Sequence, residues 1–213
     1  MITLYRAPFS TNVERVALAL AHKGLEVESV VIDYSDRRPV EEVSGQGLVP
    51  VIEDGDTVVN DSVAILRHLE ERYPEPALFP SETARRAELD VFLDWFEREW
   101  KLPPNAIEEE LDGPSPDTER IAGLAGLMDE RLDLFERMLT GRDHLFGELS
   151  AADFYAFPFL KYARSRDAVD DELFHRVLDE HQSLGSNHPR LAAWIERIDA
   201  MPRAYIGPTL FTG

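Results

Sequence analysis

Residues 48–62 read LVPVIEDGDTVVNDS: a short apolar segment, a turn, a second apolar segment and the start of a helix. Asp54-Gly55 is a strong hairpin signal, because both central residues of a type I′ turn need positive φ. Pro50 is tolerated as the first residue of a strand, and the backbone of Val49 just before it is left to pair with an extended ligand. Ser62 would open a helix whose N–H groups can bind an anion. The stretch predicts a site for a small peptide that carries a carboxylate.

The sequence upstream of this hairpin predicts a β-α-β unit. The candidates for its two strands and its helix are residues 2–5, 27–32 and 13–20. Such a unit implies a parallel strand pair with a right-handed crossover. Residues 33–47 are polar, and we expect a loop or a short irregular helix there. With a helix over 63–73, the order of elements is that of a thioredoxin-like α/β domain, expected over residues 1–80.

Downstream of a proline-rich linker at 74–80 the pattern becomes helical. The segments with apolar residues at helical spacing are 84–110, 121–139 and 189–200. Ser150 and Asp153, three residues apart, have the form of a helix-capping box. No convincing strand remains in this part of the sequence. We therefore expect an all-α domain over residues 85–213.

The composition excludes several kinds of site and partner. The 213 residues include no cysteine, so any thiol chemistry must use a thiol brought by a ligand. The net charge of −19 repels nucleic acid and anionic membranes, and we expect neither as a partner. The six histidines show no metal-ligand spacing, so no metal is expected. No apolar run is long enough to span a bilayer and no signal peptide is evident, which makes a cytoplasmic location the expectation.

Five elements, in order along the chain, resemble the glutathione S-transferase family, in the pattern of its phi-class and related bacterial members. They are Leu4-Tyr5 with Ser10-Thr11-Asn12 and Arg15-Val16, then Leu48-Val49-Pro50, Asp61 to Ile65, Ser150 to Asp153, and Pro189 with Trp194 and Pro202. The resemblance covers nearly the whole chain. It implies a thioredoxin-like domain that binds glutathione and a helical domain that contributes an electrophile pocket. It also implies a homodimer that serves in detoxification by transferring glutathione to a small apolar electrophile.

Ser10, just before the first expected helix, is the catalytic residue that the resemblance implies. Only the thiolate of glutathione is a competent nucleophile, and hydrogen-bond donors at a helix N-terminus lower the pKa of the thiol. The Ser10 hydroxyl would donate to that thiolate. A serine in this place is also an ordinary helix cap. Thr11 and Glu14 have the form of a capping box, however, so we expect Thr11 to cap the helix and leave Ser10 free.

The resemblance also implies which residues hold glutathione. Ser62 would bind the γ-glutamyl carboxylate and Asp61 its ammonium group, although Asp-Ser before a helix is equally an ordinary cap. Val49 would pair its backbone with the cysteinyl unit, with Pro50 in the cis form. Asn12 would support the sulfur or merely lie in the first turn of the helix.

Leu48 departs from the family pattern: it stands where many members have Gln or Lys, so one side-chain contact to glutathione is missing. In the loop at 33–47, Arg37 and Arg38 are candidates for the glycyl carboxylate, although an arginine there is equally an ordinary solvated charge. The electrophile pocket is expected between the two domains, lined by Phe9, Phe96, Trp100 and Tyr162. Two other functions stay open: glutathione-dependent peroxide reduction, and a non-catalytic ligand-binding or scaffold role on the same fold.

Overall fold

The structure is a computed structural model that describes residues 1–204. The chain forms two compact units: residues 1–80 together with the segment from Met201, and residues 81–200. From the sequence we expected the segment from Met201 to belong to the helical domain over residues 85–213. The expected end of that domain at residue 213 lies outside the described residues. Within the first unit, Ala204 N–H donates to the Ala17 carbonyl at 3.0 Å and Arg203 pairs with Glu14 at 2.8 Å.

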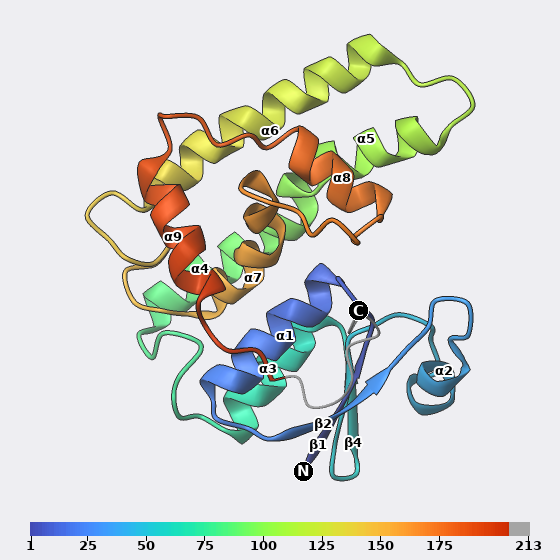
Figure 1. Ribbon diagram of the computed structural model, residues 1–213. Helices are drawn as coiled ribbons and strands as arrows, with labels where there is room; N and C mark the ends of the chain where they lie inside the picture. The colour runs from blue at the N-terminus through green and yellow to red at the C-terminus, as the bar shows by residue number, and fades with distance from the viewer. Residues whose placement is uncertain (205–213) are drawn as a thin grey trace. The chain divides into compact units, whose positions relative to one another are not determined.

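The first unit is built on a four-stranded mixed sheet with the order β2-β1-β3-β4 (Figure 1). The strands are β1 (Ile2–Arg6), β2 (Val27–Val31), β3 (Val51–Asp54) and β4 (Thr57–Asn60). Strands β1 and β2 are parallel, whereas β3 runs antiparallel to both β1 and β4. The parallel pair and the β3–β4 hairpin confirm the predicted thioredoxin-like order.

The turn of the hairpin differs from the prediction by one residue. Asp54 pairs with Thr57, so the two central residues are Gly55 and Asp56. Gly55 has φ of 64°, and Asp56 is not among the described residues with positive φ. A type I′ turn needs positive φ at both central positions, whereas a type II′ turn has glycine at the first one alone. The φ values at Gly55 and Asp56 therefore fit type II′ and not the predicted type I′.

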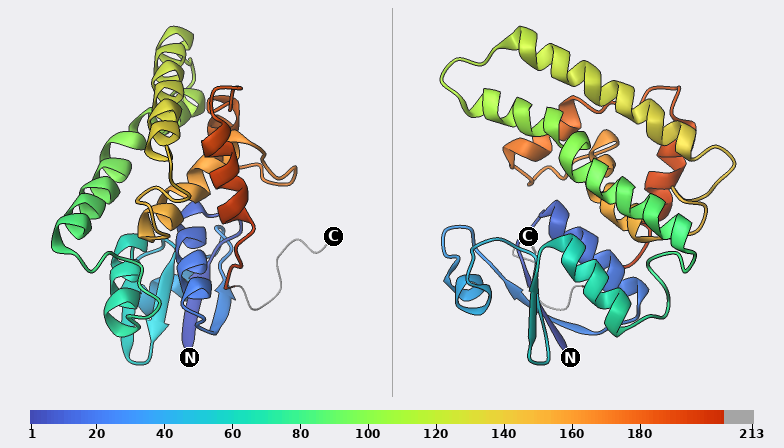
Figure 2. Two further views of the ribbon diagram at one scale, coloured as in Figure 1. Left: turned by 90° about the vertical axis from the view of Figure 1, so that its left-hand side faces the viewer. Right: turned by 180° about the vertical axis from the view of Figure 1, so that it is seen from behind.

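Helices cover both faces of this sheet. They are α1 (Thr11–His22), α2 (Arg38–Ser44) and α3 (Ser62–Arg72). Helices α1 and α3 lie side by side, away from α2, in Figure 1 and in the right-hand view of Figure 2. Val40 of α2 packs with Tyr5 and Val51 of the sheet. Successive strand residues point to opposite faces, so the fully buried Leu4 and Ile52 face the α1–α3 layer.

Every named element of the second unit is helical. These elements are α4 (Thr83–Trp95), the π-helical η1 (Phe96–Trp100), α5 (Leu102–Asp112), α6 (Thr118–Met138), α7 (Ala151–Leu160), the short η2 (Lys161–Ala163), α8 (Leu173–Glu180) and α9 (Pro189–Asp199). Helices α5 and α6 run side by side (Figure 2). The predicted capping box is present: the Asp153 carboxylate accepts from the Ser150 N–H at 3.0 Å. The same buried carboxylate accepts from the Trp194 ring N–H at 2.8 Å and so ties α9 to α7.

An arginine completes the irregular junction between α4 and α5. Pro103 and Pro104 have no N–H to give to the carbonyls four residues earlier, those of Glu99 and Trp100. Arg131 of α6 donates from Nη1 to both carbonyl oxygens, at 2.6 and 2.9 Å. Arg131 of α6 therefore supplies the two hydrogen bonds that Pro103 and Pro104 of α5 cannot make.

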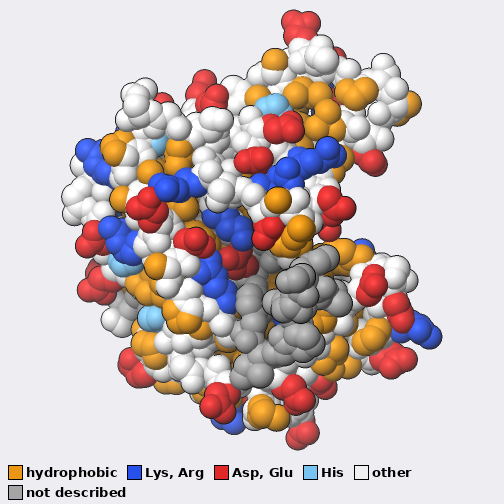
Figure 3. Space-filling view, in the orientation of Figure 1, with side chains coloured by type: hydrophobic (Ala, Val, Ile, Leu, Met, Phe, Trp, Pro, Cys, Tyr) orange, Lys and Arg blue, Asp and Glu red, His pale blue; other side chains and the backbone are white. Residues whose placement is uncertain are grey.

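The surface agrees with the acidic composition. Figure 3 shows Asp and Glu side chains spread over the visible face with Lys and Arg between them. Within residues 1–204, no helix combines the length and apolar character needed to cross a membrane.

Candidate functional site

Three segments of the first unit meet at one edge of the sheet. Val51 at the start of β3 is paired with Tyr5 on one side and with Asn60 on the other. The residues just beyond these positions therefore leave the sheet at the same edge. They belong to the loop before α1, to the Val49–Pro50 segment and to the first turn of α3.

Ser10 is the N-cap of α1, and the prediction that Thr11 would cap the helix is wrong. Thr11 is the first helical residue, and the Ser10 Oγ accepts a long hydrogen bond from the Val13 N–H at 3.4 Å. The expected capping box does not form: Thr11 lies inside the helix, and the Glu14 carboxylate pairs with Arg203. The Ser10 hydroxyl hydrogen donates to no residue of the described chain.

Asp61 and Ser62 begin α3 in the same manner. Asp61 is the N-cap, and its Oδ1 accepts from the N–H groups of Val63 and Ala64 at 3.0 Å each. Its Oδ2 has no partner within residues 1–204. Ser62 is 4% exposed, and its Oγ accepts from Arg15 at 3.2 Å. One carboxylate oxygen and one hydroxyl hydrogen thus remain for a ligand.

Arg15 joins the two helix starts, and we did not single it out from the sequence as a functional residue. Its Nη1 donates to Asn12 Oδ1 at 2.7 Å as well as to Ser62 Oγ. The side chain is buried, at 1% exposure. The available signal was an arginine on the apolar face of α1, between Val13 and Leu18. Such a residue must find polar partners inside the fold.

Backbone strain is concentrated at this edge. Among the residues that the structure describes, Phe9 with φ of 57° and Asp61 with φ of 71° are the non-glycine residues in the left-handed region. Each stands immediately before a candidate ligand-binding residue, Ser10 or Ser62. Strained non-glycine residues of this kind cluster at functional sites, where the surrounding structure holds them.

The Tyr5 hydroxyl also lies near this edge, but it already donates its hydrogen to another side chain. It is 7% exposed and donates to Glu53 Oε2 at 2.6 Å. Burial, together with this hydrogen bond, raises the pKa of Tyr5 to about 12. Tyr5 therefore stays a protonated donor to Glu53 and is not the hydroxyl that we assign to a thiolate.

The Val49–Pro50 peptide bond is cis, as the resemblance implied. The Val49 N–H and C=O make no hydrogen bond within the described chain. Just before it, the Gln46 side chain holds both the N–H and the C=O of Leu48, at 2.6 and 2.9 Å. The backbone of Val49 is thus available to an extended ligand next to an ordered segment.

The two candidate anchors for a glycyl carboxylate both form hydrogen bonds within the chain. Arg37 donates to the Gly47 carbonyl at 3.0 Å. Arg38 forms a two-point pair with Asp36 at 2.7 and 2.6 Å on the exposed surface. Leu48, which is 68% exposed, offers only an apolar contact.

Three of the aromatic residues expected to line an electrophile pocket belong instead to the core of the second unit. Phe96, Trp100 and Tyr162 are 0%, 2% and 2% exposed. The rings of Phe96 and Trp100 stack at 4.4 Å, and Tyr162 stacks on His175 and donates to Asp170. Their side chains face neighbours rather than an open surface. Phe9, by contrast, is half-buried and lies beside Ser10.

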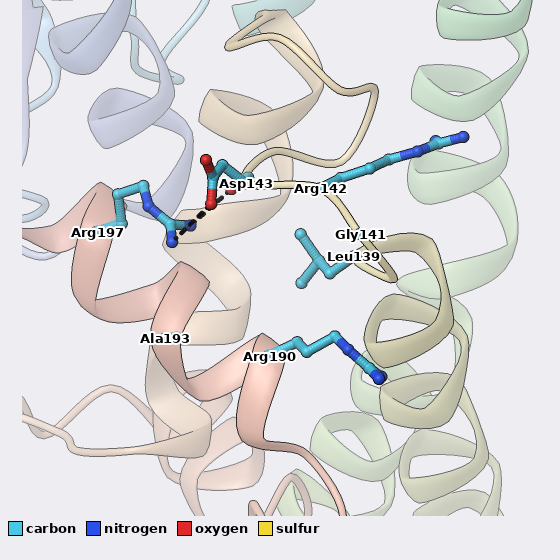
Figure 4. Close-up of a pocket in the computed structure, with 7 residues that line it drawn as sticks. All are labelled: Leu139, Gly141, Arg142, Asp143, Arg190, Ala193 and Arg197. Carbon is cyan, nitrogen blue, oxygen red and sulfur yellow. Dashed lines mark hydrogen bonds and ion pairs between the residues drawn. The ribbon is translucent and has the colours of Figure 1, made fainter.

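A cavity of about 340 Å³ lies in the second unit. Three arginines line it, but Arg197 pairs with Asp143 and Arg190 with Glu136. Figure 4 shows the Arg197 guanidinium beside Asp143, whereas Arg142 and Arg190 extend away from them toward the other side of the view. Within residues 1–204, no group of three or more acidic or histidine side chains is arranged to hold a metal ion.

Comparison with known proteins gives the family. Residues 4–77 match the family model of the glutathione S-transferase N-terminal domain. Glutathione S-transferase F10 of Arabidopsis thaliana is 30% identical over 175 residues, which are 76% of this chain and 80% of that protein. The chain belongs to the glutathione S-transferase family. A solved structure of a glutathione S-transferase from Rhodospirillum rubrum F11 is 26% identical and covers 95% of this chain and 89% of its own, with a TM-score of 0.74.

The predicted family and fold of this glutathione S-transferase are therefore confirmed, and its likeness to phi-class members in particular stays a prediction. Membership supports glutathione transferase activity in general terms, with glutathione as co-substrate. Another relative is FtsZ-localized protein A of Caulobacter vibrioides, which is 29% identical over 167 residues, 72% of this chain and 73% of that protein.

Proposed function

We propose that this protein conjugates the glutathione thiolate to a small apolar electrophile, with Ser10 stabilising the thiolate. The observation that carries the proposal is the state of the Ser10 hydroxyl. It lies at the N-terminus of α1 and accepts one long hydrogen bond from the Val13 N–H. Its own hydrogen is not donated within the described chain and so can be donated to a ligand. A donor and a helix N-terminus both favour the charged form of a sulfur placed there, and so lower the pKa of its thiol.

The chemistry then needs no protein base. The bound thiol loses its proton to solvent, and the thiolate attacks an electrophilic carbon of the second substrate. A carbon–sulfur bond forms while the leaving group departs or the electron pair moves into a conjugated system. The contribution of Ser10 is to favour the thiolate before the attack.

The proposed binding of the glutathione backbone uses the groups that the fold leaves open. Ser62 would donate its hydroxyl hydrogen to the γ-glutamyl carboxylate, and Asp61 Oδ2 would accept from the ammonium group. Val49 would pair its N–H and C=O with the cysteinyl unit, beside cis-Pro50. Asn12 would donate from its side-chain nitrogen toward the sulfur.

The second substrate and the assembly also remain proposals. Phe9 is the aromatic residue that we keep for the electrophile, because it is half-buried beside Ser10. From the family we also propose a thioredoxin-like glutathione-binding domain over 1–80 and a helical electrophile-binding domain over 85–213. We further propose a cytoplasmic homodimer with a role in detoxification. Sedimentation velocity tests the dimer directly.

Substitution of Ser10 tests the catalytic role, with a matched control for helix capping. Ser10→Ala is expected to lower kcat/KM by about 100-fold, the typical loss of one donor to a developing or stabilised anion. It also removes a cap, which costs about 1 kcal/mol of stability. Asp117→Ala removes the equivalent cap of α6, where Asp117 accepts from Glu119 and Arg120 at 3.0 Å each. The control should lose stability alone. Equal turnover in wild type and Ser10→Ala would overturn the proposal.

A second candidate is a non-catalytic binding protein of the same fold. Two observations favour it: Arg37 and Arg38 already form hydrogen bonds within the chain, and one relative is FtsZ-localized protein A. Calorimetry with glutathione separates the two candidates. Binding that weakens in Ser62→Ala supports the transferase, whereas no binding to wild type supports the second candidate.

A further inference from the structure

A buried guanidinium lies beneath the proposed glutathione site. Arg15 stands in the second turn of α1 with 1% of its side chain exposed. Its Nη1 gives one hydrogen to Asn12 Oδ1 at 2.7 Å and the other to Ser62 Oγ at 3.2 Å. One nitrogen therefore ties α1 to the first residue of α3.

The chemistry of arginine decides which atoms of its partners remain for a ligand. A guanidinium has donors and no acceptor, so both partner oxygens must accept. Asn12 is then left with its Nδ2 and Ser62 with its hydroxyl hydrogen, and neither of these donates to another residue within 1–204. Without Arg15, the Asn12 amide can flip and the Ser62 hydroxyl can rotate. Each would then be able to present a lone pair to an anion.

We propose that Arg15 is a positioning residue that holds Asn12 and Ser62 as donors toward an anionic γ-glutamyl ligand. The inference rests on the proposed function and adds to it a residue that does not touch the ligand. The buried charge acts in the same direction, since a cation in a low-dielectric interior attracts an anion more strongly than an exposed one does. This effect matters in a chain whose net charge is −19.

A double-mutant cycle on glutathione binding tests the inference. Arg15→Met removes both hydrogen bonds and keeps much of the side-chain volume, and it is expected to raise the Kd for glutathione about ten- to a hundredfold. Ser62→Ala alone also raises the Kd. Because Arg15 acts partly through Ser62, the double variant should raise the Kd by clearly less than the product of the two single fold-changes.

Two further variants separate positioning from folding. Arg15→Lys keeps the charge but not the planar fork of donors, so its Kd should fall between those of wild type and Arg15→Met. Arg131→Met removes an arginine that bridges two backbone carbonyls of the second unit. It should lower the melting temperature and leave the Kd for glutathione unchanged. If Arg15→Met does not fold, the cycle is run with Arg15→Lys and Ser62→Ala.

The outcomes distinguish this inference from the proposed function. If wild type fails to bind glutathione, the proposed function is wrong and the inference falls with it. If wild type binds and a folded Arg15 variant binds equally well, or the fold-changes simply multiply, the inference alone is overturned. Binding by wild type with non-multiplying fold-changes supports both.

Discussion

Each polar residue of the proposed site divides its hydrogen-bonding capacity between the fold and a ligand. Ser10 accepts from Val13 and keeps its proton, and Asp61 caps α3 with one oxygen and keeps the other. Ser62 accepts from Arg15 and likewise keeps its proton. A capping role and a ligand-binding role are therefore compatible at these residues. Removal of a whole side chain tests both roles at once, so more selective substitutions are needed.

Asp61→Asn is such a substitution. Asparagine caps helices as well as aspartate does and tolerates positive φ, so the melting temperature should change little. The loss of charge removes the partner of the glutathione ammonium group, and the Kd should rise about tenfold, as for other hydrogen bonds to charged groups. Calorimetry and thermal unfolding measure the two effects. Asp117→Asn at the cap of α6 is the control, and an unchanged Kd in Asp61→Asn would contradict the assignment.

At the residue scale, sequence reasoning found the polar candidates and misjudged their local partners. Ser10 was chosen because the family resemblance implies a catalytic serine just before the first helix. The capping box expected for Thr11 also needed the Glu14 carboxylate, which hydrogen-bonds instead to Arg203, a residue 189 positions later. The bridge from Arg15 to Ser62 likewise spans 47 positions. Local spacing contains no information on such long-range pairs.

Among the elements, the junction of α4 and α5 depends on a single arginine. Arg131→Met leaves the carbonyls of Glu99 and Trp100 without their donor, and we expect a loss of about 1–3 kcal/mol in the free energy of unfolding. Chemical denaturation measures it. Arg98→Met, which breaks an exposed pair with Asp94 in the same region, should cost under about 0.5 kcal/mol. Equal losses in the two variants would show that the bridge to the carbonyls contributes nothing.

The contact between α5 and α8 should make stability depend on pH through Glu108. Its pKa is raised, first by burial and then by the carboxylates of Glu172 and Asp112. The charged form therefore costs stability in the folded state at neutral pH. Glu108→Gln removes this cost while keeping an oxygen for the Phe174 N–H, so its melting temperature should exceed that of wild type at neutral pH.

The gain in melting temperature that we expect from Glu108→Gln depends on pH. It should shrink as the pH falls through the raised pKa of folded Glu108. Below the ordinary pKa of an unfolded glutamate it should vanish, because the residue is then protonated in both states. Thermal unfolding of both proteins across this range provides the measurement. A gain that stays constant under strongly acidic conditions would contradict the electrostatic cause.

Predictability from sequence also varied among elements. The β3–β4 hairpin and the parallel β1–β2 pair follow from local patterns of apolar and turn residues. Helix α8 was missed, because it is only eight residues long and its buried residues owe their burial to packing against α5. Helical spacing of Phe96 and Trp100 is the same for a core stack as for a pocket wall. Periodicity therefore identified the helix correctly and could not assign those aromatic residues to a ligand.

For the whole molecule, the net charge of −19 should make stability depend on salt. Acidic side chains spread over the surface repel one another in the compact state, and salt screens this repulsion. We expect the melting temperature to rise between low salt and about 0.5 M sodium chloride, where the screening length is a few ångströms. Differential scanning calorimetry measures the shift. A melting temperature that is flat or falls with salt would show that self-repulsion is unimportant.

The most direct test of the proposed function is the pKa of the glutathione thiol in the bound state. Thiolate absorbance in the ultraviolet, titrated against pH, reports it for wild type and for Ser10→Ala. In wild type we predict a pKa below that of a free thiol, about 8.5, and in Ser10→Ala a return toward that value. Bound glutathione with the same thiol pKa in both proteins would contradict the claim that Ser10 stabilises the thiolate.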